Sequence, residues 1–285
     1  MRQVISQNAT RPFVSRKRTP EEPYLAQATN IKWFSFVFLA LIFSPSAPVH
    51  AGPPFVTDDP EPVEFHGWEF YIASEPERTK EGWSGTLPHM EFNYGAFRNV
   101  ELHLETPVYF SAPRGGGLSI GYGDTEVGFK YRFIQETDKS PQLAIYPLLE
   151  IPSGNGSRGV GTKNLNLFLP IWARKSFGNW TIDAGGGYWI NPGTDNLNWG
   201  FFGAVAQRKI TKKLSLGAEI YHERPQTVDG TSNTIVNGGA IIETSEHTHF
   251  VFSVGHSIQG ASALVAYIGV QIEFGPDQNE TTETH

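Results

Sequence analysis

Hydrophobic and polar residues alternate along most of the chain, from about residue 66 to Phe274. The last run, 263–274, is the clearest. Successive side chains of a strand point to opposite sides, so one face of this run is entirely apolar: Leu264, Ala266, Ile268, Val270, Ile272 and Phe274. The other face carries Tyr267, Gln271 and Glu273. An unbroken apolar face opposite a polar one is typical of a strand with lipid outside and a polar lumen inside.

About twelve such runs follow one another, and most have roughly the nine to eleven residues that a tilted membrane strand needs. The predicted strands are 66–74, 87–96, 100–110, 125–133, 142–151, 163–174, 180–190, 199–209, 214–223, 234–243, 249–258 and 262–274. Short turns such as 97–99 alternate with longer loops such as 111–123. Outer-membrane barrels have short periplasmic turns, longer external loops and an even strand count. We therefore predict an all-β fold, a single antiparallel transmembrane β-barrel of about twelve strands over residues 66–274.

Two further features of the strands lead to predictions. Aromatic residues gather toward the strand ends, where we expect them to form girdles at the two membrane interfaces. They are Trp68, Tyr109, Tyr131, Trp172, Trp180, Trp189, Trp199, Tyr221 and Phe274. Pro107, Pro147 and Pro170 interrupt the alternation and predict bulges or strand ends, because proline cannot donate to a ladder.

The segments outside the barrel have distinct compositions. Residues 1–51 read as an N-terminal extension and signal peptide: an apolar core at 33–43 precedes the small residues of Val49-His50-Ala51, and cleavage is expected after Ala51. Residues 52–65 are a proline-rich periplasmic leader that we expect to fold into or across the barrel mouth. Residues 275–285 form a polar C-terminal tail. The chain is therefore expected to be exported to the bacterial outer membrane.

Composition excludes several classes of protein. The chain has no cysteine, which rules out disulfides and cysteine-bearing zinc sites. Its mean hydropathy is -0.30, and no long apolar run occurs in the body, which excludes a bundle of membrane helices. The formal net charge is -7 and falls to -11 without the six basic and two acidic residues of 1–51. Nucleic acid is therefore not expected as a partner.

The start of the predicted mature chain carries a family resemblance. Residues 51–63, Ala-Gly-Pro-Pro-Phe-Val-Thr-Asp-Asp-Pro-Glu-Pro-Val, and the Trp-Glu-Phe-Tyr at 68–71 resemble the mature start of a family of bacterial outer-membrane proteins. That family is described as transporter-like or linked to the meta-pathway of phenol degradation. Residues 123–133 and the turn at 152–156 are similar to it as well. The resemblance implies a barrel that handles aromatic or other hydrophobic compounds.

The closing strand carries a second resemblance. The pattern Gly269-x-x-Ile272-x-Phe274 is similar to the C-terminal recognition signal of bacterial outer-membrane barrels. It implies that the barrel-assembly machinery recognises Gly269, Ile272 and Phe274. Outer-membrane lipid and lipopolysaccharide are the other partners that the resemblance implies.

Charged residues on the inner faces supply the candidate site. The predicted lumen and solute-contact residues are Glu101, His103, Glu105, Glu126, Lys130, Arg132, Glu219 and Glu223. His103 shares a face with Glu101 and Glu105, which makes general acid–base chemistry conceivable. A salt-bridge network with Lys130 and Arg132 on the next strand is the favoured interpretation. We predict no catalytic centre, cofactor or metal site, and we interpret His247 and His249 as turn residues.

These features favour a barrel that passively admits small solutes, with charged lumen residues setting selectivity. A structural or adhesive barrel with a plugged lumen, acting through its external loops, is the alternative. An embedded enzyme and a secreted β-sandwich are two further hypotheses.

Overall fold

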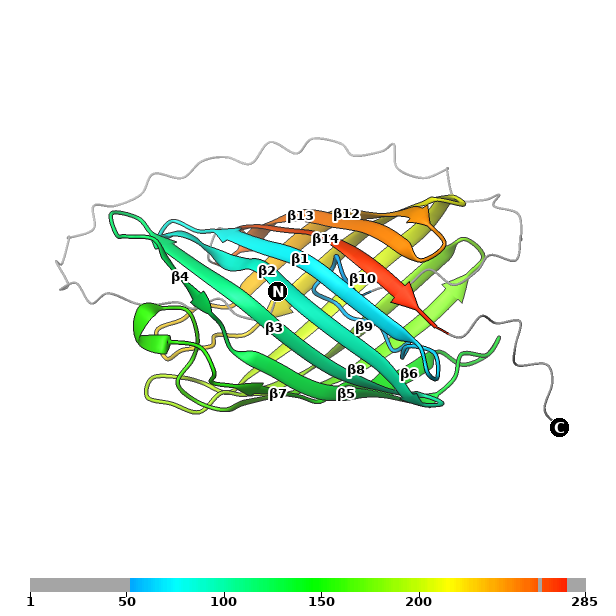
Figure 1. The fold of residues 1–285 in the computed structure, drawn as a ribbon, viewed down its shortest axis with the longest axis horizontal. Coiled ribbons are helices and arrows are strands. Elements are labelled where there is room, and N and C mark those ends of the chain that lie inside the picture. The colour runs from blue at the N-terminus through cyan, green and yellow to red at the C-terminus, as the bar shows by residue number, and fades with distance from the viewer. Residues whose placement is uncertain (1–51, 261–262, 276–285) are drawn as a thin grey trace, which may run out of the picture.

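The chain folds into one antiparallel sheet that closes on itself (Figure 1). The structure is a computed structural model, and it describes residues 52–260 and 263–275. Closure results from pairing of the first strand, β1 (Trp68–Arg78), with the last, β14 (Leu264–Phe274). A closed sheet leaves no free edge to pair with another chain. The predicted all-β barrel is confirmed.

The remaining strands run in sequence order around the wall. They are β2 (Gly82–Phe97), β3 (Val100–Pro113), β4 (Ser119–Tyr122), β5 (Thr125–Ile134), β6 (Gln142–Ile145), β7 (Leu148–Ile151), β8 (Asn166–Phe177), β9 (Trp180–Ile190), β10 (Trp199–Thr211), β11 (Leu214–Glu223), β12 (Asn233–Ser245) and β13 (Thr248–Gln259). A 3-10 turn, η1 (Gly156–Arg158), lies in the loop before β8. Within residues 52–260 and 263–275, no helix is long and apolar enough to cross a membrane.

Two wall strands are interrupted, and this gives a barrel of 12 strands. Both β4 and β5 pair with β3, and both β6 and β7 pair with β5 and β8. Pro147 lies between β6 and β7, so the strand end predicted there is confirmed. Pro107 lies beside a register shift between β2 and β3. Pro170 pairs with Gly187 in an unbroken register, so the bulge predicted there is wrong.

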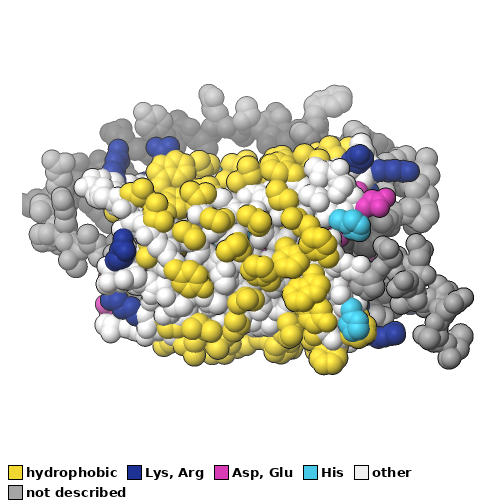
Figure 2. Space-filling view, in the orientation of Figure 1, with side chains coloured by type: hydrophobic (Ala, Val, Ile, Leu, Met, Phe, Trp, Pro, Cys, Tyr) yellow, Lys and Arg dark blue, Asp and Glu magenta, His cyan; other side chains and the backbone are white. Residues whose placement is uncertain are grey.

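Apolar side chains cover the outside of the wall. Leu102, Phe129 and Ile268 are 50%, 41% and 51% exposed, whereas their sequence neighbours His103, Lys130 and Tyr267 are buried. In Figure 2, hydrophobic side chains cover the middle of the face and Lys and Arg gather near its ends. Apolar outward and polar inward is the alternation that a membrane barrel requires.

The predicted aromatic girdles are wrong for five of the nine residues. Trp68, Tyr131, Trp180 and Phe274 are exposed on the outside, as expected. The other five are buried inside: Tyr109, Trp172, Trp189, Trp199 and Tyr221. The physical reason is parity, because odd or even position along a strand decides which face a side chain takes, whatever its distance from the strand end.

Most of the inward aromatics fill one side of the lumen, where β6 to β11 form the wall. The cluster consists of Tyr146, Leu148, Phe168, Trp172, Trp189, Trp199, Phe201 and Tyr221. The rings of Phe168 and Phe201 stack with centroids 4.9 Å apart, and those of Trp189 and Trp199 stack at 5.8 Å. This side of the interior is therefore a packed core.

The leader, residues 52–65, lies inside the ring of strands (blue in Figure 1). Ser253 Oγ on β13 donates to the carbonyl oxygen of Pro54 at 2.5 Å. Phe55 packs against Val205 of β10 in a small buried cluster. The leader precedes β1 in the sequence, yet it contacts strands as distant along the chain as β10 and β13.

The predicted signal peptide at 1–51 and all of the predicted tail except Gly275 lie outside the described residues. Cleavage after Ala51 stays a prediction.

Candidate functional site

The leader is tied to the wall by ion pairs inside the barrel. Lys130 Nζ on β5 lies 3.3 Å from Asp58 Oδ1 and 3.8 Å from Asp59 Oδ1. An Arg174 nitrogen on β8 lies 3.5 Å from Asp59 Oδ2, and Arg132 on β5 pairs with Glu61. These cations and carboxylates are largely buried, so solvent screens the pairs less than it would at a surface.

The predicted salt bridges of Lys130 and Arg132 with the β3 acids are wrong, because the acids that pair with these cations come from the leader. Glu101 lies directly opposite Lys130 in the β3–β5 register. Its Oε2 nevertheless accepts a hydrogen bond from the Val63 backbone N–H at 2.9 Å. Sequence reasoning placed Lys130 and Arg132 against the acids of β3, whereas their ion pairs are with leader acids.

Two predicted residues, Glu101 and Glu219, act as acceptors for the leader backbone. A proline-rich segment forms no ladder, so its buried N–H groups need other partners. Glu219 on β11 accepts from Thr57 N at 2.5 Å and from Val56 N at 3.2 Å. Asn237 on β12 donates to the same carboxylate at 2.5 Å. Both glutamates therefore hold the leader in place.

A cavity of about 500 Å³ lies between the leader and the wall formed by β1, β2, β3 and β14. His103, Glu105 and Lys130 line it, together with tyrosines 71, 146 and 267. It also reaches Glu246 and His247, in the short turn between β12 and β13. The cavity therefore extends from the interior to the barrel end that carries the short turns.

A second cavity of about 60 Å³ adjoins the first at Glu75 and Glu105, which line both. Glu126 and Glu150 line this smaller space with Tyr109. Glu223 lines neither cavity. Its carboxylate instead accepts hydrogen bonds from Gln226 at 3.3 Å and Asn233 at 3.5 Å, near the loop between β11 and β12.

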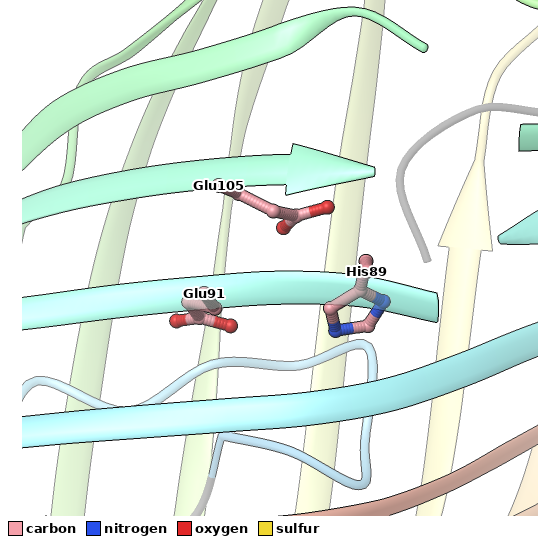
Figure 3. Close-up of side chains that lie close together, drawn as sticks. All are labelled: His89, Glu91 and Glu105. Atoms are coloured by element: carbon pink, nitrogen blue, oxygen red, sulfur yellow. The ribbon is translucent and has the colours of Figure 1, made fainter. Parts of the chain in front are cut away.

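Four glutamates form a row across the wall, called the acidic row below. Register places Glu91 opposite Glu105, Glu105 opposite Glu126, and Glu126 opposite Glu150, on β2, β3, β5 and β7. Figure 3 shows His89 and Glu91 on one strand and Glu105 on the next. The row runs from the first cavity, which Glu91 lines, to the second, which Glu126 and Glu150 line.

Sequence reasoning missed several of these residues. Asp58, Asp59 and Glu61 were assigned to the leader and not to the site. The signal that could have found them is the cluster of acidic residues next to prolines. Glu91 and His89 lie in the predicted strand 87–96, but neither was among the predicted lumen residues. The place of Glu91 in the acidic row follows only from strand register.

A closed 12-strand wall with an apolar exterior and an ion-paired interior defines a membrane-spanning β-barrel with a partly filled polar lumen. Residues 81–274 match the family described as "Putative MetA-pathway of phenol degradation". The chain belongs to this family, so the resemblance drawn from its motifs is confirmed.

Solved structures of outer-membrane channels and porins share this fold. An outer membrane channel from Pseudomonas putida F1 aligns with a TM-score of 0.58 and 15% identity, over 79% of this chain and 100% of that one. The KdgM porin in complex with disordered oligogalacturonate aligns with a TM-score of 0.51 and 13% identity, over 72% of this chain and 99% of that one. The NanC porin aligns with a TM-score of 0.52 and 7% identity, over 71% of this chain and 98% of that one. The outer-membrane location expected for this chain agrees with these neighbours.

No curated protein matches the chain in a sequence comparison.

Proposed function

We propose that this protein is an outer-membrane channel that passively admits small solutes. The observation that carries the proposal is the cavity of about 500 Å³ between the leader and β1–β3, which reaches the short-turn end of the barrel. A barrel of eight strands is filled by side chains, whereas one of about sixteen leaves a wide channel. Twelve strands with an internal leader suit a narrow passage lined by charge. Family membership and the fold shared with channels and porins support the same function and favour it over a structural or catalytic role.

Single-channel recording in planar bilayers tests this function. Purified protein should give discrete conductance steps. Loosening the leader with Asp58→Asn, Asp59→Asn and Glu61→Gln together should enlarge the steps, because these changes remove its ion pairs with the wall. Asp195→Asn, in the loop between β9 and β10, is the matched control and should conduct like the wild type. A folded protein that leaves the bilayer silent would refute the proposal.

We further infer that small aromatic compounds are the favoured solute class. The family description refers to phenol degradation, and Tyr71, Tyr146 and Tyr267 line the cavity. Aromatic rings attract each other by edge-to-face or offset contacts worth about 0.5–1.5 kcal/mol per pair. Benzoate should therefore block the current at lower concentration than hexanoate, and Tyr267→Leu should reduce that difference. Equal block by the two carboxylates would contradict the solute class and leave the channel itself intact.

We also infer that the barrel-assembly machinery recognises β14 through Gly269, Ile272 and Phe274. Phe274 is exposed at the end of β14. Phe274→Ala should lower the amount of heat-modifiable barrel in outer membranes while purified protein still folds in detergent. Normal amounts in membranes would contradict this role. Lipid and lipopolysaccharide would surround the apolar wall.

A further inference from the structure

We propose that the lumen binds one divalent transition-metal ion of the Zn²⁺ class through His103, Glu105 and Glu126. One ring nitrogen of His103 and one carboxylate oxygen of each glutamate lie within 4.8 Å of one another. A shared ion requires all three atoms at about 2.0–2.2 Å from it, and the flexible glutamate side chains would turn to reach that distance. The proposal concerns binding to the folded chain and does not depend on solute passage.

The hydrogen bonds of His103 prepare its ring for metal binding. Asn93 Nδ2 donates to Glu69 at 3.1 Å and to Glu91 at 2.9 Å, which makes Asn93 Oδ1 the acceptor on the other side of the amide. That oxygen lies 2.8 Å from His103 Nδ1, so Nδ1 carries the proton. Nε2 is then the unprotonated nitrogen that a metal requires. Metal-binding histidines are typically oriented in this way by a hydrogen bond at the other ring nitrogen.

The metal-facing atom of His103 is itself deeply buried. The residue is 5% exposed, and among the described residues its Nε2 has no hydrogen-bond partner. An unmet buried polar atom carries a desolvation cost of about 1–3 kcal/mol. Asn93 and Tyr146 both lie at Nδ1, so the proposed ligand atom is Nε2. A bound cation would satisfy this atom.

The acidic row supplies the charge that favours a cation. Like charges directly opposite one another on neighbouring strands repel. Glu105 lies opposite Glu91 on one side and Glu126 on the other, so an ion beside it lowers repulsion along the row. One imidazole and two carboxylates suit a transition metal, whereas Ca²⁺ and Mg²⁺ prefer oxygen ligands alone. Three protein ligands also leave a coordination position open to the cavity.

A second ligand set overlaps the first. His89, Glu91 and Glu105 also bring one ligand atom each within 4.8 Å of the others, and Figure 3 shows them on β2 and β3. Glu105 is common to both sets. His89 Nδ1 lies 3.1 Å from Thr86 Oγ1, and Glu91 already accepts from Asn93. The orphaned nitrogen of His103 therefore favours the first set.

Titration of Zn²⁺ into tag-free full-length protein in detergent, followed by calorimetry, tests the proposal. We expect one site per chain, and Ca²⁺ should bind at least 10-fold more weakly. Glu105→Gln and His103→Asn should each weaken Zn²⁺ binding at least 100-fold, whereas His89→Asn should change it less than 3-fold. Glu223→Gln, a lumen glutamate away from both cavities, is the control and should bind normally.

The opposite pattern would overturn the assignment. If His89→Asn abolished binding and His103→Asn did not, the ion would lie in the second set. If wild-type protein bound no Zn²⁺, or bound it with unchanged affinity in Glu105→Gln, the site would not exist. Heat-modifiable gel mobility shows whether each variant is folded. If one fails to fold, a saturable rise in the wild-type Tm with Zn²⁺, reversed by EDTA, supports binding, and an unchanged Tm refutes it.

Discussion

At the residue scale, Lys130 is central to the lumen. It is buried between the strand wall and the leader, with Asp58 and Asp59 within 4 Å of its Nζ and the ring of Tyr146 at 4.8 Å. A buried ion pair is weak evidence for net stability, but the removal of one partner leaves a buried charge unpaired. Loss of Lys130 should therefore disturb the leader.

Replacing Lys130 by Met should destabilise the barrel by about 3 kcal/mol, the lower end of the cost of breaking a buried pair. The free energy of unfolding in urea, measured in detergent micelles, gives the value. Lys212→Met, on the exposed turn between β10 and β11, is the control and should change it by less than about 0.5 kcal/mol. Equal stability of the two variants would show that the leader is not anchored through Lys130.

Glu136 gives a pH prediction outside the membrane strands. Burial opposes its ionisation, but hydrogen bonds from Lys175 Nζ and from the backbone and side chain of Ser176 outweigh burial and hold the pKa of Glu136 below its usual value of 4.5. Because the folded pKa is depressed, the stabilising contribution is present above pH 4.5 and is lost as pH falls through the folded pKa. Titration of the labelled carboxyl by NMR should show a midpoint below 4.5 that returns toward 4.5 in Lys175→Met. A midpoint at or above 4.5 in the wild type would contradict the network.

At the element scale, the leader approaches β2 closely at Gly95. A Cβ atom added at Gly95 would lie 1.8 Å from the carbonyl oxygen of Glu64, which is backbone and cannot rotate away. The carbonyl of Gly95 also accepts a hydrogen bond from His66 N at 2.8 Å. Glycine is therefore required here by close approach of two backbones.

Gly95→Ala should destabilise the protein by roughly 2 kcal/mol, within the range for forced overpacking. Gly238→Ala on β12 is the matched control, because an added Cβ there has nothing within 4 Å. Urea unfolding gives both values, and protease cleavage within the leader should increase only in Gly95→Ala. A neutral Gly95→Ala would mean that the leader can be displaced at no cost.

The alternation of apolar and polar residues predicted the strands well, but it did not predict which distant residues contact each other. The strands at 180–190 and 214–223 were predicted to the residue, because their alternation ends at clear turns. The same parity should have directed Trp172 and Trp189 inward, but strand-end position was weighted above face. The partners of Asp58 and Glu61 lie about 70 or more residues away, and no local pattern encodes them. The acidic row needs strand register, which alternation alone does not fix.

At the scale of the whole molecule, the barrel separates two environments. Lipid-facing positions such as Leu102 are apolar and exposed, and inward positions on the same strand hold ion pairs and hydrogen bonds. Leu102→Arg should lower the free energy of unfolding by about 2–4 kcal/mol if residue 102 lies near the bilayer midplane. Folding into lipid vesicles at a series of urea concentrations measures this cost, and Thr106→Ala on the same strand serves as a conservative comparison. A cost below about 0.5 kcal/mol would place Leu102 outside the membrane.

Substituted-cysteine modification during single-channel recording tests the central claim, passage of solutes through the lumen, most directly. The chain has no cysteine of its own. Tyr267 and Ile268 are adjacent residues of β14, and Tyr267 faces the cavity whereas Ile268 faces the lipid. A water-soluble thiol reagent should reduce the conductance of Tyr267→Cys in a single step and leave Ile268→Cys unchanged. Identical responses of the two variants, or no conductance from either folded protein, would contradict a passage along this wall.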